Sequence, residues 1–199
     1  VRHQSERSSA YLLLVFAANQ VIAGLGTATP FDVVRFTPDD PWTYPLGSGT
    51  FSWAFQGKPK GLTTSGEKID AFDTVNTNEF IFSTTGAAAI PTAPILKAAD
   101  EDLFYWLDWA WEWGTSLSLD GSNITGLAAE DINGYWYDSQ TNDHYVTILG
   151  AFNLGGVTGN SKNIVRLSWN GNGYTPSIVP WLAPGANFPT NIDAIELAR

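Results

Sequence analysis

The sequence predicts an all-β fold made of three repeats of four strands each. The first reason is a block that recurs about every 65 residues, a period typical of stacked or radially repeated units. Its copies align without a gap and place an aliphatic residue, Ile22, Ile90 or Leu154, at the same position. The second reason is that the blocks on either side recur in the same order, and each is short, rich in β-branched and aromatic residues and bounded by turn-forming residues. The copies of the central block are Val15–Gly24, Ser83–Thr92 and Thr147–Gly156.

The flanking blocks supply the other strands of each repeat. The expected first strands are Lys68–Val75, Asp131–Asp138 and Asn191–Ala198. The expected third strands are Phe31–Phe36, Glu101–Trp106 and Lys162–Leu167. The expected fourth strands are Thr50–Gly57 and Ser116–Gly121, with a looser match at Ser177–Gly185. Four such strands per unit are typical of the blades of a propeller.

The order of the blocks predicts a closed arrangement. The chain opens at the second strand of a repeat, Tyr11–Ala17, and ends with the first strand of one, Ile192–Ala198. Because pairing these two strands would leave no open edge, we expect a β-propeller-like ring or, alternatively, a β-prism-like one. Two other arrangements stay open: tandem hairpin pairs without a ring, and two chains that share one larger ring. The expected domains are a polar N-terminal arm at residues 1–10 and one three-repeat domain at residues 11–199.

Composition excludes several classes of function. The 199 residues are 44% hydrophobic and 14% aromatic, which is enough for a packed core. The formal charge of −10 argues against nucleic acid, whose phosphates bind basic surfaces, and against an anionic membrane surface. Disulfides and thiolate chemistry are excluded because the chain has no cysteine. Membrane insertion is not expected either, since no apolar run reaches the roughly 18 residues of a spanning helix.

The densest aromatic run lies in the second repeat. Trp109, Trp111 and Trp113 alternate with other residues, so on an extended strand they project from one face. Trp136 and Tyr137 follow in the next strand. Flat aromatic side chains suit a subunit interface or stacking against sugars, and they equally suit packing between neighbouring sheets. These five side chains are the predicted binding or interface residues.

Acidic residues offer only weak metal sites. Asp100, Glu101 and Asp102 are consecutive, and neighbouring carboxylates can supply several of the oxygens that calcium needs. No Asp-x-Asp-x-Asp-Gly loop is present, so an exposed strand lead-in is the favoured interpretation, and Asp100 and Asp102 stay weak calcium candidates.

A second acidic position recurs at the start of the first strands, as Asp70, Asn133 and Asp193. These groups could ring a central ion, but bonds to the backbone of the adjoining turn are the favoured role. No metal or other cofactor is predicted.

Catalytic motifs are missing from the sequence. The two histidines, His3 and His144, sit in no recognisable nucleophile triad or zinc-ligand spacing. Paired carboxylates for sugar hydrolysis stay open, because they come together in space and not in sequence. Asn123 begins the one Asn-x-Ser/Thr glycosylation motif, which matters only where the source glycosylates exported proteins.

Four motifs are distinctive: GEKIDAF at 66–72, STTGAAAI at 83–90, DEDLF at 100–104 and LGAFNLGGVTG at 149–159. They resemble a group of exported bacterial proteins that are propeller-like, built from β repeats and largely uncharacterised. The resemblance covers nearly everything from Tyr11 to Arg199. It implies an extracellular or cell-surface module and carries no catalytic residues over to this chain.

Together these features favour a non-catalytic extracellular structural protein that self-associates, as a subunit of a filament or surface assembly. The polar arm, the aromatic face and the lack of a catalytic constellation motivate this hypothesis. The first alternative is a lectin-like glycan-binding module that uses grooves between repeats. A weaker alternative is a carbohydrate-active enzyme. The expected partners are copies of the same chain and glycans.

Overall fold

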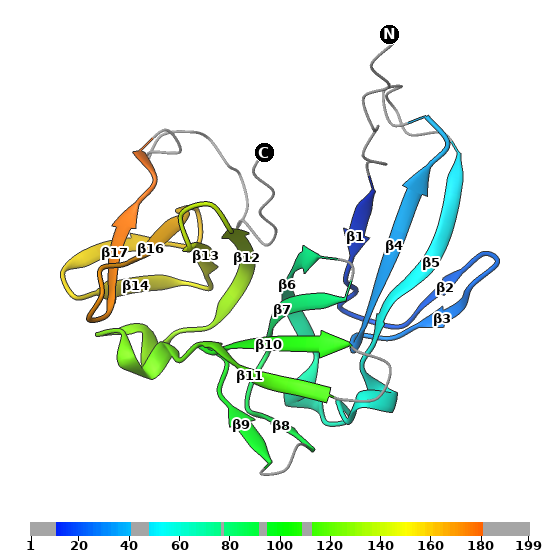
Figure 1. Ribbon diagram of the computed structural model, residues 1–199, viewed down its shortest axis with the longest axis horizontal. Helices are drawn as coiled ribbons and strands as arrows, with labels where there is room; N and C mark the ends of the chain where they lie inside the picture. The colour runs from blue at the N-terminus through cyan, green and yellow to red at the C-terminus, as the bar shows by residue number, and fades with distance from the viewer. Residues whose placement is uncertain (1–10, 41–47, 77, 92–94, 109–112, 181–199) are drawn as a thin grey trace, which may run out of the picture. The chain divides into compact units, whose positions relative to one another are not determined.

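The computed structural model describes residues 11–40, 48–76, 78–91, 95–108 and 113–180. In this part the chain is all-β, with seventeen strands, four short 3-10 helices and no α-helix (Figure 1). None of the described helices is long and apolar enough to cross a membrane. The expected N-terminal arm at 1–10 and the expected last strand, Asn191–Ala198, lie outside the described residues. Contacts divide the chain into two compact units, Val1–Lys58 and Pro59–Arg199.

The second and third repeats each form the four-stranded antiparallel sheet that the sequence predicts. The second consists of β6 (Ile69–Asn76), β7 (Glu79–Thr84), β10 (Leu103–Asp108) and β11 (Trp113–Leu119). The third consists of β12 (Ile132–Asp138), β13 (Asp143–Ile148), β16 (Val165–Trp169) and β17 (Tyr174–Ile178). In both sheets each strand pairs with the next one of the set, so the two sheets have the same topology. The last strand, β17, begins earlier than the expected segment Ser177–Gly185.

The first repeat forms a sheet of three strands within the described residues. They are β1 (Leu12–Leu14), β4 (Asp32–Pro38) and β5 (Gly49–Gln56), in that order across the sheet. These strands correspond to the second, third and fourth strands of the other repeats. The position of a first strand, which β6 and β12 fill elsewhere, lies beside β1.

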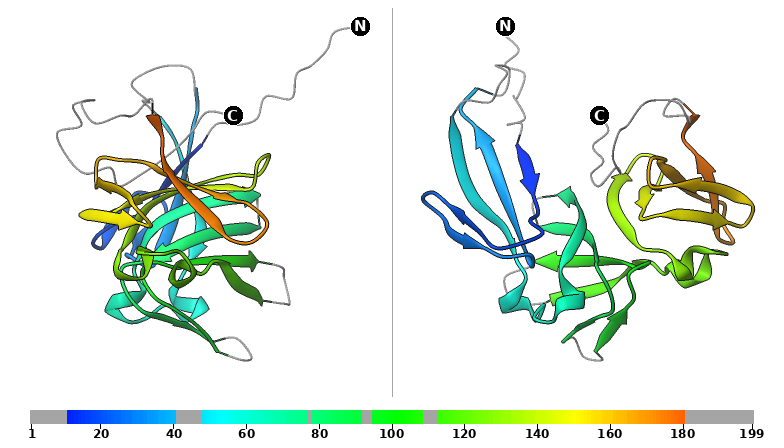
Figure 2. Two further views of the ribbon diagram at one scale, coloured as in Figure 1. Left: turned by 90° about the vertical axis from the view of Figure 1, so that its left-hand side faces the viewer. Right: turned by 180° about the vertical axis from the view of Figure 1, so that it is seen from behind.

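Each repeat also contains a hairpin that the sequence did not predict. The hairpins are β2–β3 (Gln20–Ile22 and Gly26–Ala28), β8–β9 (Ala88–Ile90 and Leu96–Ala98) and β14–β15 (Ala151–Leu154 and Val157–Asn160). They pair only within themselves, and the first two project from their sheets (Figure 2). The recurring aliphatic residue lies in the first hairpin strand, where Ile90 and Leu154 are buried. The block that is most similar between the three repeats therefore forms a hairpin outside the sheet. With this hairpin, each full repeat has six strands.

The second and third repeats share one hydrophobic core. Its buried side chains include Leu103 and Leu119 from one repeat and Ile132, Val146 and Leu167 from the other. Polar bonds also join the two repeats: the Ser83 hydroxyl donates to the Ile132 carbonyl at 2.8 Å, and the Tyr137 amide donates to the Asp73 carboxylate at 2.9 Å. Repeats that bury apolar surface against each other in this way depend on one another for stability.

Short 3-10 helices occupy the links between repeats. The link from β5 to β6 holds η1 (Lys58–Lys60) and η2 (Ser65–Glu67), and the link from β11 to β12 holds η3 (Gly121–Asn123) and η4 (Leu127–Ala129). The Glu67 carboxylate accepts from the amides of Thr63 and Thr64, both at 2.7 Å, and so fixes the approach to β6.

Candidate functional site

The predicted tryptophan face falls mostly outside the described structure. Trp109 and Trp111 lie outside the described residues, and Trp113 is the first residue of β11. The role of the tryptophan face as an interface or binding surface stays a prediction.

Trp136 and Tyr137 project from opposite faces of β12, as successive residues of a strand do. Trp136 is buried and packs edge-on against Tyr145, with ring centroids 5.1 Å apart. Tyr137 is half-buried, and its ring lies 5.3 Å from that of His144. Of the two, Tyr137 is thus the side chain available to a ligand.

Asp102 fixes a turn with both of its carboxylate oxygens. One accepts from the Ala99 amide and the other from the Gly121 amide, each at 2.8 Å. Asp32 does the same in the first repeat, toward the amides of Thr29 and Gly57. These bonds join the start of the third strand to the end of the fourth, so a structural role accounts for this recurring acid.

In the third repeat Asn163 takes the same position and accepts one such bond, from the Asn160 amide at 2.9 Å. Asp100, the other weak calcium candidate, is half-buried, and its carbonyl accepts from the Ile132 amide. Among the described residues, no group of three metal-ligating side chains comes together.

We predict that Asp102→Ala destabilises the protein by about 2 kcal/mol, because two buried amides lose their acceptor. Asp102→Asn should cost less, since an amide oxygen can keep one bond, as Asn163 does. Equilibrium denaturation in urea measures both losses. Equal losses for the two variants would contradict this role.

The second recurring acid makes a cross-strand bond. The Asp70 carboxyl is hydrogen-bonded to the Ser83 hydroxyl at 2.6 Å, and Asn133 accepts from the Thr147 hydroxyl at 3.0 Å. Both residues sit where the pairing of the first and second strands shifts register. The equivalent Asp193 lies outside the described residues.

Asp70 also faces Asp131, which lies just before β12. Burial, together with the neighbouring Asp131 charge, raises the pKa of Asp70 to about 8. The pKa of Asp131 is also raised, mainly by burial. One proton shared between the two carboxyls relieves their repulsion, so this pair is a structural element that depends on pH.

Asn123, the predicted glycosylation residue, ends η3 and is exposed. Its position leaves the side chain open to modification, and modification itself stays a prediction.

His144 lies at the centre of a hydrogen-bonded chain in the third repeat. Its Nδ1 is 2.8 Å from the Tyr135 hydroxyl, and its Nε2 is 3.1 Å from the Tyr174 hydroxyl. Ser118 is hydrogen-bonded to the Tyr135 hydroxyl and extends the chain. Burial lowers the pKa of His144 to about 4, so the imidazole is neutral at pH 7. A neutral ring donates to one tyrosine and accepts from the other.

The hydrogen-bonded side chains around His144 lie beside a pocket of about 350 Å³. The side chains around it come from five strands, β11, β12, β13, β16 and β17, and one turn. They are Ser118, Tyr137, Asn142, His144, Trp169 and Tyr174.

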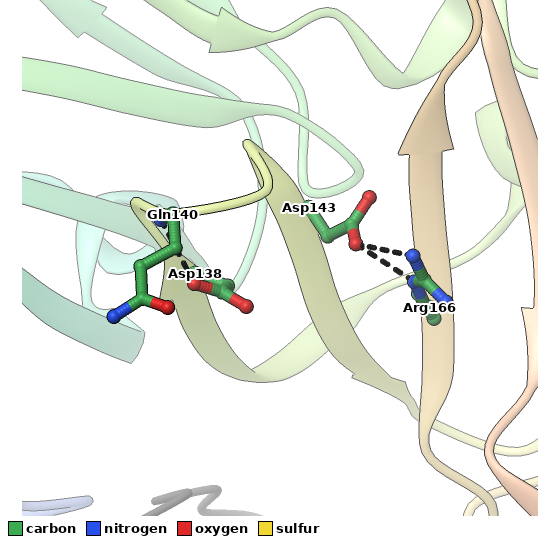
Figure 3. Close-up of polar contacts among 4 residues, drawn as sticks. All are labelled: Asp138, Gln140, Asp143 and Arg166. Atoms are coloured by element: carbon green, nitrogen blue, oxygen red, sulfur yellow. Dashed lines mark hydrogen bonds and ion pairs between the residues drawn. The ribbon is translucent and has the colours of Figure 1, made fainter. Parts of the chain in front are cut away.

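The turn between β12 and β13 is fixed at both ends (Figure 3). At one end the Asp138 carboxylate accepts from the Gln140 amide at 2.9 Å. At the other, Asp143 pairs with Arg166 through two contacts of 2.6 and 2.8 Å. Burial raises the pKa of Asp143, but hydrogen bonds from Ser168, Thr141 and Arg166 outweigh it, so the pKa is lowered.

Asn142 occupies this turn with a φ of 59°, a left-handed conformation that asparagine tolerates better than most residues. Its side-chain oxygen accepts from the Tyr137 hydroxyl at 2.8 Å. The fixed turn therefore holds one polar wall of the pocket in place.

The sequence showed no catalytic or zinc-ligand spacing around His144, and it did not predict the position of this side chain in the hydrogen-bonded network. A signal was present, because the repeat places Phe80 and Leu12 at the equivalent positions, ten residues before Ile90 and Ile22. A histidine in a position that is otherwise apolar indicates a local polar site.

Comparisons with protein-family models, with curated proteins and with solved structures found no match.

Proposed function

We propose that this is a non-catalytic structural protein that self-associates, because the outer edge of β1 takes up the Asn191–Ala198 strand of a second copy. The observation that carries the proposal is that, among the described residues, the first sheet has three strands where the other two have four. In the other repeats β7 pairs with β6 and β13 pairs with β12, whereas β1 pairs only with β4 among the described residues.

The side chains along the edge of β1 are apolar and partly exposed, as is typical of a surface that another strand covers. The run from Tyr11 to Phe16 carries only apolar and aromatic side chains, and Leu12 is 47% exposed. Natural sheet edges are normally protected by charges or proline. Strand β17, at an edge of the third sheet, contains Pro176, which illustrates that protection.

The segment after β17 matches the missing strand in position and sequence. Twelve residues separate the fourth strand from the next first strand in both described cases, 57–68 and 120–131. After β17 the thirteen residues 179–191 precede Ile192. The sequence NIDAIELA at 191–198 then repeats the KIDAFDTV of β6.

The equivalent strands give the register of this pairing. Asp73 pairs with Ile81 in the second repeat, and Trp136 pairs with Tyr145 in the third. The same alignment pairs Glu196 with Leu13. If one chain supplied both strands, its repeats would close into the propeller-like or prism-like ring that the sequence predicts. We propose exchange between copies, which makes the same backbone bonds while linking chains, and we place such an assembly outside the cell.

We predict that the native chain has a mass well above 21.6 kDa in solution and that this mass grows with concentration. Light scattering across a concentration series measures it. Leu12→Lys should return the mass to that of a monomer, because a charge on the edge opposes strand addition. Val21→Lys is the matched control, since Val21 is 83% exposed on β2 and away from the edge. A native chain that stays monomeric at every concentration would overturn the proposal.

Cysteine pairs test the register directly, because the natural chain has no cysteine. Leu13→Cys with Glu196→Cys should form a disulfide between chains on oxidation. A disulfide within one chain would contradict exchange and favour ring closure. The positive control is Ala89→Cys with Lys97→Cys, two exposed residues that pair across β8 and β9.

A further inference from the structure

We propose that the pocket around His144 binds a neutral sugar unit of a glycan. All of its described lining lies in the unit Pro59–Arg199, so this site does not depend on the β1 edge that carries the proposed self-association. Two kinds of surface make up the site, an aromatic one and a polar uncharged one.

The aromatic surface consists of Trp169, Tyr174 and Tyr137. Trp169 is 55% exposed, although it is one of the largest apolar side chains of the chain. Its ring is held edge-on against Tyr174, with centroids 5.2 Å apart, and Tyr174 is held in turn by His144. An exposed indole that is already oriented loses little entropy when a ligand stacks on it. The face of a pyranose, which presents C–H groups, suits such a ring.

The polar surface is rich in groups that bind hydroxyls. Ser118, Asn142 and the hydroxyls of Tyr137 and Tyr174 provide both donors and acceptors. Most of them are already oriented by the contacts with His144 and by the fixed turn. A preformed set of neutral donors and acceptors beside an aromatic face is the arrangement that orients a small polar ligand.

Charge decides which polar ligand fits. None of the six lining side chains is charged at pH 7, because His144 is neutral and the pKa of Tyr174 is raised by burial. Arg166, on the neighbouring strand β16, is already paired with Asp143. With a formal charge of −10 the chain as a whole repels anions. Nucleotides and acidic sugars are therefore disfavoured, and a neutral sugar fits.

The size of the pocket is consistent with this ligand. Ligand pockets in proteins span about 300–1,000 Å³. At about 350 Å³ this one is near the lower limit, so it suits one or two sugar rings and leaves the rest of a glycan in solvent. The equivalent positions of His144 in the other repeats are Phe80 and Leu12, so only the third repeat places a histidine there.

The test is isothermal titration calorimetry of the full chain with neutral disaccharides of glucose, galactose, mannose and N-acetylglucosamine, and with an acidic uronate disaccharide. We expect saturable binding of at least one neutral sugar and none of the uronate. Trp169→Ala should weaken binding at least about tenfold, as expected for loss of a stacked anchor. Asn142→Gly keeps the left-handed turn and removes the amide, so it should also weaken binding.

Two controls keep the outcome clear. Phe51→Ala removes an exposed aromatic of β5, outside the pocket, and should leave affinity unchanged. Circular dichroism of Trp169→Ala should match that of the native chain, because its side chain is mostly exposed. The proposal is overturned by an absence of binding to every neutral sugar, by unchanged affinity in Trp169→Ala, or by preference for the uronate. A fall in oligomeric mass of Trp169→Ala would assign the tryptophan to self-association, and that result would also overturn it.

Discussion

Gly126→Ala is expected to destabilise the unit Pro59–Arg199 by about 3 kcal/mol or more. Gly126 is the residue just before η4 and has a φ of 90°, and a Cβ placed on it would collide with the Asn153 carbonyl of β14. The neighbouring Leu127 and Leu154 belong to the shared core, so the backbone cannot move away without opening packed apolar contacts. The variant should therefore lower the midpoint of urea denaturation, followed by tryptophan fluorescence.

Gly150→Ala separates the clash from the backbone strain. Gly150 has nearly the same φ, 93°, but nothing lies within 4 Å of a Cβ placed there. The stability lost in Gly150→Ala should be limited to the cost of an alanine in the left-handed conformation, about 1–2 kcal/mol. Similar losses for the two variants would show that contact between η4 and β14 is not what makes Gly126 necessary.

Asp70→Asn is expected to stabilise the protein increasingly as the pH rises. Because the folded-state pKa of Asp70 is raised to about 8 from its ordinary value of 3.8, the folded protein holds a proton that the unfolded chain releases. This contribution to stability is complete below about pH 4 and is lost as the pH rises through 8. The asparagine side chain does not titrate, and its oxygen can still accept from Ser83, as Asn133 accepts from Thr147.

The difference should grow by several kcal/mol in favour of Asp70→Asn between pH 4 and pH 9, since each unit of pKa shift contributes about 1.4 kcal/mol. Denaturation in urea at a series of pH values measures it. Asp39→Asn removes the same formal charge at an exposed position and should show no such growth. A constant difference across the series would mean that Asp70 and Asp131 do not share a proton in the folded protein.

The sequence by itself determined the all-β class and the limits of the repeats. Alternation and turn residues report which segments are extended, and these are local properties that survive without knowledge of the neighbours. The roles of the recurring acids were predicted wrongly. Asp70 and Asn133 were expected to bond the backbone of a turn, and they bond hydroxyls across the sheet instead. Asp102 was expected in an exposed lead-in, and it is buried and holds two backbone amides.

Only the tertiary structure decided how these parts come together. The three hairpins were missed because their strands are three or four residues long, too short for alternation to distinguish them from a turn. The pocket brings together Ser118, His144 and Trp169 from three strands and Asn142 from a left-handed turn, and no spacing in the sequence records that convergence. Asp70 and Asp131 share a proton because packing of the second repeat against the third places the carboxyls face to face. The local alternation of the sequence determines the face of its strand from which a side chain projects. The strand register and the packing between repeats determine which residues that side chain contacts.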